Sequence, residues 1–298
     1  NTKDFKRKCF ERIKTDISQD SANLYFLSTF LTPFERKRII ERIKSKKAEG
    51  GVKPNIIIST QLIEAGVDLS VHTVFRVLAP LDSIIQAAGR ANRYNELGKI
   101  SEVFIYLIEG KMEQLSERIY GPALLEKTKQ VLEKIETVEE RNYLDLIEAY
   151  FKKIRQRADG MESQLYKDLC LLNFQKVGNF EFIEERRTES VFIQLNEEAK
   201  SVWEEYVAIE KNEQQLDAYD QKAAFAKIKG HFYDFVINVP ISWGKDHIEF
   251  DSEPEYFFYV SKLEHPSVCY RYDYDTNGEN FRLNLGYVPV KKQSLFDP

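Results

Sequence analysis

Residues 55–93 of this chain read NIIISTQLIEAGVDLSVHTVFRVLAPLDSIIQAAGRANR, and the fold is predicted from this stretch outward. The first five residues, Asn55–Ser59, form a short Ile-rich run after a proline, which is typical of a buried parallel strand. A polar loop follows, and residues 73–78 form a second run rich in β-branched residues. The pattern predicts two strands separated by a loop.

A helix is predicted next, with Asp82 or Ser83 as its N-cap and Arg93 near its end. Gln86, Arg90 and Arg93 are spaced i, i+4 and i+7, so they would project from one stripe of such a helix. Two guanidiniums and an amide on one stripe suit a polyanion such as a nucleoside triphosphate, because guanidinium binds phosphate oxygens bidentately. The alternative is a solvated polar helix face.

The flanking sequence continues an alternation of strands and helices. Residues 24–27 and 103–108 are predicted strands, and Thr32 to Glu35 form a capping box with Pro33 at the first helical position. The alternation indicates an α/β fold with an open parallel sheet flanked by helices.

In such sheets ligands bind beyond the carboxyl ends of the strands, which is where the loop after Asn55–Ser59 begins. Ser59, Thr60 and Gln61 are therefore candidate contacts to a nucleic-acid backbone. We expect Glu64 to pair with a basic residue inside the same lobe.

Two segments resemble known motifs. QLIEAGVDLS is similar to motif V, and QAAGRANR to motif VI, of superfamily 2 helicases. STQLIEAGVD followed by APLDSIIQAAGRANR resembles more narrowly the CRISPR-associated helicase of type I interference systems. The resemblance implies that the parallel sheet is RecA-like.

The resemblance also implies roles for site residues. Arg93 would be the catalytic arginine finger, Arg90 a second contact to the γ-phosphate, and Gln86 a further nucleotide contact. Gly66 and Asp68 would lie near the nucleotide, with Asp68 placed to meet a ribose hydroxyl. No metal ligand is predicted in this chain.

The cofactor implied is ATP with Mg²⁺, held mainly by a different lobe. The sequence contains neither a G-x-x-x-x-G-K-[ST] phosphate loop nor a DExH box, and it lacks the His-Asp pair of an HD nuclease. It also begins without Met. We therefore expect a piece of a longer ATP-dependent DNA helicase that is inactive alone. The partners implied are single-stranded DNA, a first RecA-like lobe, an HD nuclease domain and a crRNA-guided surveillance complex.

Three domains are predicted: a second RecA-like lobe at residues 1–110, a helical linker at 111–173, and an α+β C-terminal domain at 174–298. In the last domain, residues 231–239, 255–260 and 268–274 read as strands, and Asn277-Gly278 as a hairpin turn.

Composition limits the class of protein. The net charge is −5, but residues 1–54 carry +7 and residues 111–298 about −10, which indicates a localised polyanion site. No apolar run is long enough for a membrane span, and three scattered cysteines suggest neither disulfides nor a zinc site. A cytoplasmic protein is expected.

Two other functions fit the same residues. One is a superfamily 2 helicase for repair or RNA remodelling. The other is a non-catalytic nucleic-acid-binding module in which the RecA-like lobe is a relic.

Overall fold

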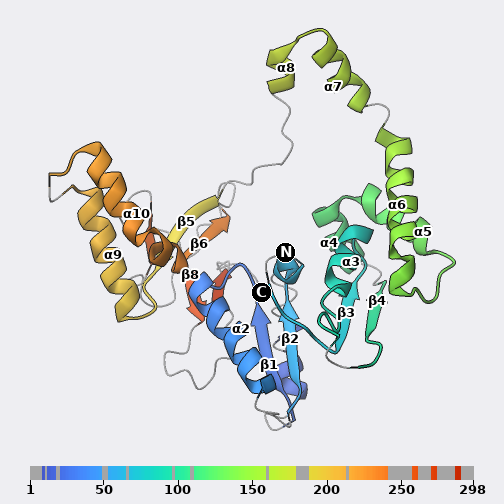
Figure 1. Cartoon of the computed structure of the whole chain (residues 1–298), viewed down its shortest axis with the longest axis horizontal. Coiled ribbons are helices and arrows are strands. Elements are labelled where there is room, and N and C mark those ends of the chain that lie inside the picture. Colours follow the sequence, from blue (N-terminus) through green and yellow to red (C-terminus); the bar gives the residue numbers. More distant parts are fainter. Residues whose placement is uncertain are drawn as a thin grey trace, which may run out of the picture. The chain divides into compact units, whose positions relative to one another are not determined.

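The structure is a computed structural model of the 298-residue chain. It describes residues 9–10, 12–17, 21–48, 53–64, 67–95, 98–107, 111–158, 161–178, 188–212, 215–240, 257–260, 270–273 and 286–289. The chain falls into two compact units, one formed by residues 1–62 with 186–298 and the other by residues 63–185 (Figure 1). Each unit is described by itself.

The first unit combines helices with short strands. Its elements are β1 (Asn23–Leu27), α2 (Pro33–Ala48), β2 (Asn55–Ser59), β5 (Thr188–Ile193), α9 (Glu197–Glu210), α10 (Ala218–Asp234), β6 (Val236–Pro240), β7 (Phe257–Tyr259), β8 (Tyr270–Asp273) and β9 (Gly286–Pro289). The 3-10 helix η1 (Gln61–Ile63) spans the division between the units.

Strands β1 and β2 pair in parallel, from Asn23 opposite Asn55 to Leu27 opposite Ser59. All five residues of β1 are buried, as expected of a parallel strand covered on both faces. Phe10, from the helical segment before β1, meets Phe26 edge to face at 5.7 Å. The two strands and the helix between them are confirmed.

Helix α2 begins with the predicted capping box. The Glu35 backbone N–H donates to Thr32 Oγ1 at 3.3 Å, and the Thr32 hydroxyl donates to Glu35 Oε2 at 3.3 Å. Both residues are fully buried. Burial raises the pKa of Glu35 to about 8, because it removes the carboxylate from water, while the Thr32 bonds and Arg38 partly offset this effect.

The largest core of the first unit is aromatic. β5 lies between β6 and β7 in an antiparallel sheet, and α9 packs against α10. Phe192 meets Trp203 at 5.0 Å and Phe232 at 5.1 Å. Trp203 in turn stacks on Phe258 at 4.5 Å. These contacts join strand to helix across the core.

This core includes residues from the N-terminal part of the chain. Phe30 belongs to the same buried cluster, and Phe34 lies 5.1 Å from Phe235. On the surface, Lys37 pairs with Asp234 at 2.6 Å. The start of α2 is therefore packed against the end of α10, although almost two hundred residues separate them.

The prediction of a strand at residues 231–239 is wrong for its first part. Residues 231–234 continue α10, and β6 begins at Val236. Phe225, Ile228 and Phe232 are spaced by three and four residues, which is the apolar stripe of a helix. The predicted turn at 277–278 lies outside the described residues.

The second unit is mostly helical. Its elements are β3 (Thr73–Val77), α3 (Leu81–Ala88), β4 (Glu102–Tyr106), α4 (Lys111–Tyr120), α5 (Pro122–Leu132), η2 (Glu140–Asn142), α6 (Tyr143–Ala158), α7 (Met161–Cys170) and α8 (Phe174–Gly178).

Strands β3 and β4 form a second parallel pair, again joined by a helix. Their exposed face carries stacked aromatic rings, with Phe75 5.3 Å from Phe104 and 6.2 Å from Tyr106. A mixed helix and strand fold is thus present, in sheets of two and three strands. The single RecA-like sheet and the three domain boundaries stay predictions.

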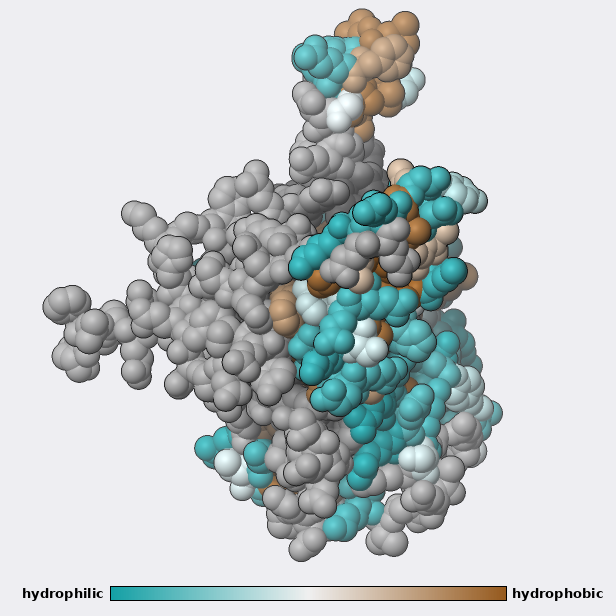
Figure 2. All heavy atoms as spheres, turned by 90° about the vertical axis from the view of Figure 1, so that its left-hand side faces the viewer, coloured by the Kyte–Doolittle hydropathy of each residue, from teal (hydrophilic) through white to brown (hydrophobic). Residues whose placement is uncertain are grey.

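Helices α7 and α8 present hydrophobic side chains to solvent. Figure 2 shows hydrophobic residues gathered at the top of the view, where Figure 1 places these helices. Tyr166, Leu171, Leu172 and Phe174 are each at least 67% exposed. No helix in the described part of the chain is long and apolar enough to cross a membrane.

The substitution Glu35→Gln should change how stability depends on pH. The folded pKa of Glu35 is about 8, above its ordinary value of 4.5, so its stabilising contribution is present below pH 4.5 and is lost as pH rises through 8. Glutamine can accept the Thr32 bond without titrating. We expect the variant to be more stable than wild type at pH 8 by on the order of a few kcal/mol, with little difference at pH 4. Thermal unfolding across this range measures it, and parallel curves for the two proteins would contradict it.

Candidate functional site

Helix α3 differs at both ends from the predicted helix. It runs from Leu81 to Ala88, and its N-cap is Pro80 without a side-chain cap bond. The expectation that Asp82 or Ser83 caps it is wrong, since both lie inside the first turn. The hydroxyl of Ser83 instead donates to Glu64 Oε2 at 2.5 Å.

The chain leaves the helix at Gly89 and forms a bridge with the end of the preceding loop. The Val71 N–H donates to the Arg90 carbonyl at 2.9 Å, and the Asn92 N–H donates to the Val71 carbonyl at 2.8 Å. Asn92 then adopts a left-handed φ of 46°. The prediction that Gln86, Arg90 and Arg93 share one helical stripe is therefore wrong, because the backbone is no longer helical at either arginine.

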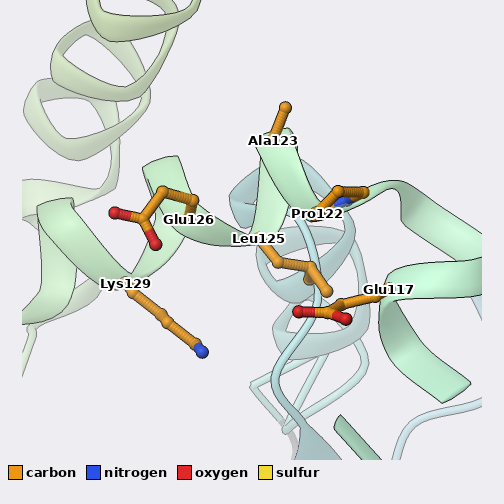
Figure 3. A pocket seen from close by; sticks show the side chains of 6 residues that line it. All are labelled: Glu117, Pro122, Ala123, Leu125, Glu126 and Lys129. Atoms are coloured by element: carbon orange, nitrogen blue, oxygen red, sulfur yellow. The ribbon is translucent and has the colours of Figure 1, made fainter. Parts of the chain in front are cut away.

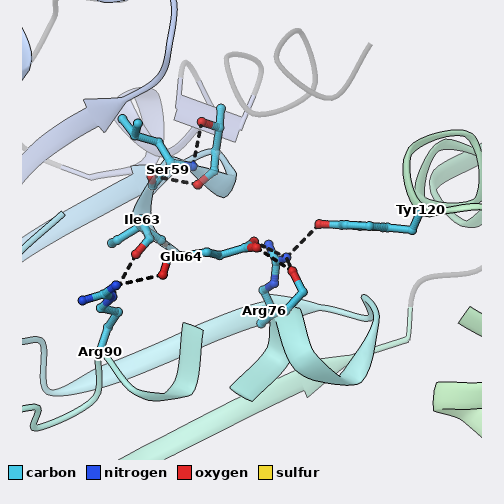
Figure 4. Close-up of polar contacts among 9 residues, drawn as sticks. Ser59, Ile63, Glu64, Arg76, Arg90 and Tyr120 are labelled. Atoms are coloured by element: carbon cyan, nitrogen blue, oxygen red, sulfur yellow. Dashed lines mark hydrogen bonds and ion pairs between the residues drawn. The ribbon is translucent and has the colours of Figure 1, made fainter. Parts of the chain in front are cut away.

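Arg90 is directed into its own unit. It is 8% exposed, and its Nε and Nη2 donate to the carbonyls of Ile63 at 2.9 Å and Glu64 at 2.8 Å (Figure 4). The guanidinium thus satisfies two backbone acceptors of the loop after β2, which would otherwise need water. In this conformation Arg90 fixes a loop, and its contact with a γ-phosphate stays a prediction.

Arg93 and Gln86 are exposed. The Arg93 side chain is 39% exposed and its Nε lies 3.8 Å from Asp68 Oδ1, while its guanidinium lies 5.8 Å from the centre of the Tyr94 ring. The Tyr94 hydroxyl donates to the same Asp68 oxygen. The structure therefore brings together Asp68 and Arg93, which are two of the predicted nucleotide contacts.

The three predicted DNA-contact residues are not equally accessible. Thr60 is 8% exposed, its N–H donates to the Leu27 carbonyl at 3.1 Å, and its hydroxyl accepts from the Leu62 N–H. The Ser59 hydroxyl donates to the Thr60 carbonyl at 3.0 Å. Gln61 alone of the three is exposed. Gly66 lies outside the described residues.

Glu64 forms a polar cluster with three other residues, Arg76, Ser83 and Tyr120, and we call these four residues the Glu64 cluster. Arg76 Nη2 donates to Glu64 Oε1 at 2.5 Å, to Tyr120 Oη at 2.8 Å and to Ser83 Oγ at 3.2 Å (Figure 4). The predicted pairing of Glu64 with a basic residue is confirmed. Arg76 and Tyr120 were missed, although a charged residue inside the apolar run of β3 is a signal for Arg76.

A shallow hollow of about 240 Å³ lies elsewhere in the second unit, at the end of α4 and the start of α5. Figure 3 shows its lining residues, which are Glu117, Pro122, Ala123, Leu125, Glu126 and Lys129. The lining mixes two carboxylates with one ammonium and includes none of the predicted site residues. Within the described ranges, no group of three His, Cys, Asp or Glu side chains is placed to hold a metal ion.

The fold and the site define a class. This is a mixed helix and strand protein in which a buried arginine fixes a polar loop, next to an exposed arginine and carboxylate. Residues 1–96 match the model of the Cas3-like C-terminal family, which is described as "CRISPR-associated nuclease/helicase Cas3, C-terminal".

Two curated proteins with a similar description match parts of this chain. The chain is 51% identical over 73 residues to the CRISPR-associated nuclease/helicase Cas3 of Haloferax volcanii, which covers 24% of this chain and 8% of the relative. It is 30% identical over 119 residues to the protein of that name from Methanothermobacter thermautotrophicus, covering 40% and 14%. The matches thus span a small part of each relative's length.

Among solved structures, the chain is similar to the crystal structure of T. fusca Cas3, with a TM-score of 0.46 and 15% identity. That likeness covers 64% of this chain and 26% of the other.

Replacing the two arginines by methionine should separate their roles. Arg90→Met leaves two carbonyls of the loop without a donor, so we expect a loss of stability on the order of 2–4 kcal/mol. Arg93→Met removes an exposed side chain and should change stability by less than about 0.5 kcal/mol. Thermal unfolding and hydrogen exchange at residues 61–71 compare them. Equal losses would show that Arg90 does not hold the loop.

Proposed function

We propose that this chain is the second helicase lobe and C-terminal part of an ATP-dependent superfamily 2 DNA helicase of CRISPR type I interference. The observation that carries the proposal is the exposed pair of Arg93 and Asp68 beside the fixed loop, in the part of the chain that matches the Cas3-like family. The names of the curated relatives, nuclease and helicase, support the same class of activity.

The proposal includes the division of the chain into domains. In it, residues 1–110 form a RecA-like lobe, residues 111–173 a helical linker, and residues 174–298 an α+β domain. Two strand–helix–strand units with parallel strands support the lobe: β1–α2–β2 and β3–α3–β4. Parallel neighbours joined by a helix are the repeating unit of such sheets.

The donor set fits the phosphate end of a nucleotide. ATP with Mg²⁺, held mainly by another lobe, supplies the γ-phosphoryl group that is transferred to water. Arg93 presents N–H donors that can neutralise charge developing on phosphate oxygens, and Gln86 offers an amide on the same unit. In the described conformation Asp68 and Tyr94 hold Arg93 at the surface. Arg93 must then leave Asp68 to meet a phosphate, and the exposed Asp68 carboxylate can accept a further hydroxyl beside that of Tyr94.

Binding of single-stranded DNA is assigned to the loop that follows β2. Gln61 is the exposed member of the predicted set, while Thr60 and Ser59 shape the loop through their hydroxyls. The wider partners of the proposal are the first RecA-like lobe and HD nuclease domain of the same protein, and a crRNA-guided surveillance complex. Movement along DNA would follow from ATP-dependent closing and opening of the two lobes.

In the full-length protein, Arg93→Ala should lower DNA-stimulated ATP turnover by about 10³-fold, because the transition-state charge loses its guanidinium. Single-stranded DNA binding should persist. Arg155→Ala is a matched control, since Arg155 is an exposed arginine on α6. Phosphate release with and without DNA provides the measurement. Unchanged turnover in Arg93→Ala would remove the arginine-finger assignment and favour the non-catalytic module.

Gln61→Ala should weaken single-stranded DNA binding about fivefold, as expected for the loss of one polar contact to the backbone. Exposed Gln114, on α4, provides the control variant Gln114→Ala. Fluorescence anisotropy with a labelled oligonucleotide compares the two. Equal affinities for both variants and the wild type would place the DNA contact away from this residue.

A further inference from the structure

The Glu64 cluster connects the segment that resembles motif V to elements outside that segment. Glu64 lies in the loop after η1, Arg76 on β3, Ser83 on α3 and Tyr120 at the end of α4. Both carboxylate oxygens of Glu64 are used, one by Arg76 and the other by the Ser83 hydroxyl. The cluster therefore joins the loop to one strand and two helices of the second unit (Figure 4).

Burying the two charges of the Glu64 cluster costs desolvation free energy. The side chains of Arg76 and Glu64 are 14% and 10% exposed, so both charges have lost most of their water. Arg76 Nη2 has two hydrogens for three acceptors, while its buried Nε has no partner. Buried ion pairs are often no more stabilising than apolar side chains of the same volume. Stability alone does not account for this arrangement, whereas a requirement for fixed geometry does.

The backbone of Glu64 is held as well. Its carbonyl accepts from Arg90 Nη2, and the Arg90 carbonyl accepts from the Val71 N–H. Arg93 follows three residues after Arg90. Glu64 is thus connected through Arg90 to the turn that carries Arg93. In the other direction along the chain, Gln61 precedes Glu64 by three residues.

Tyr120 is the member of the cluster that lies beyond the predicted lobe. Its hydroxyl accepts from Arg76 at 2.8 Å. The same helical region also packs against α3, because α6 is in contact with α3 and Tyr150 on α6 is 1% exposed. The helices after residue 110 therefore support both the loop and the helix of the candidate site.

We propose that Glu64 is a positioning residue that couples the DNA-contact loop to Arg93, and that Tyr120 makes helix α4 part of this coupling. The inference rests on the proposed function and deepens it. It assigns to the helical region after the lobe a role in setting how strongly DNA stimulates ATP turnover. Neither residue touches the nucleotide or the DNA. Both act through Arg76 and Arg90.

The test uses the full-length protein and compares Tyr120→Phe with Tyr219→Phe. Tyr120→Phe removes one hydroxyl from the cluster, while Tyr219 is 79% exposed on α10 and serves as the matched control. We expect Tyr120→Phe to reduce the stimulation of kcat by DNA about fivefold while the KM for ATP and the DNA affinity stay near wild type. Tyr219→Phe should leave all three unchanged.

A second variant and a second measurement guard against a purely structural effect. Glu64→Gln should reduce the stimulation at least as much, and the double variant should add little, because both changes act on Arg76. Hydrogen exchange at residues 61–64 should be faster in Tyr120→Phe than in Tyr219→Phe. Additive effects of the two changes, or equal exchange in the two tyrosine variants, would overturn the inference.

The outcomes separate this inference from the proposed function. If DNA stimulates the wild type, Arg93→Ala is inactive and Tyr120→Phe behaves as wild type, the coupling role alone is wrong. If the wild type shows no DNA-stimulated ATP turnover, the proposed function and the inference are both wrong.

Discussion

The candidate site depends on the two hydrogen bonds from the buried guanidinium of Arg90 to the carbonyls of Ile63 and Glu64. A loop that leaves a strand has backbone acceptors which no neighbouring strand satisfies, and a planar guanidinium can serve two of them at once. The bridge between Val71 and Ala91 then closes the other end of the loop on the same segment. Residues 63–64, the end of α3 and the turn carrying Arg93 are consequently connected within the second unit.

In the described conformation, the two arginines of the motif VI-like segment make different contacts. Arg90 is fully engaged with its own unit, whereas Arg93 remains at the surface with Asp68 and Tyr94. An exposed ion pair contributes little stability, so Arg93 can leave it at small cost. A residue that must reach a ligand is better held by such a weak contact than by buried carbonyls. The two arginines thus differ: Arg90 is buried and bound to backbone carbonyls, and Arg93 is exposed and weakly paired.

Much of the local structure was predictable because short-range rules decide it. The Ile-rich run forms β2, and the spacing of Thr32, Pro33 and Glu35 starts α2 with its capping box. The pairing of Glu64 with a basic residue was also predictable, since a buried carboxylate needs a partner. The end of α3 was not predictable from the sequence. Ala88, Gly89 and Ala91 do not by themselves forbid a helix, and the end of the helix at Ala88 depends on the bridge to Val71. Likewise the helical stripe of Phe225, Ile228 and Phe232 outweighed the β-rich composition around residue 231.

The sequence by itself determined the order of strands and helices around residues 23–106 and the motif residues, because these depend on composition and spacing within a few turns of chain. It also determined the similarity of residues 1–96 to the Cas3-like family model. Only the tertiary structure decided that Arg90 is buried, that Arg76 and Tyr120 surround Glu64, and that Phe30 and Phe34 pack with residues near 235. These contacts join residues from 12 to about 200 positions apart. Their partners are selected by which buried donors, acceptors and rings remain to be satisfied once the chain is folded.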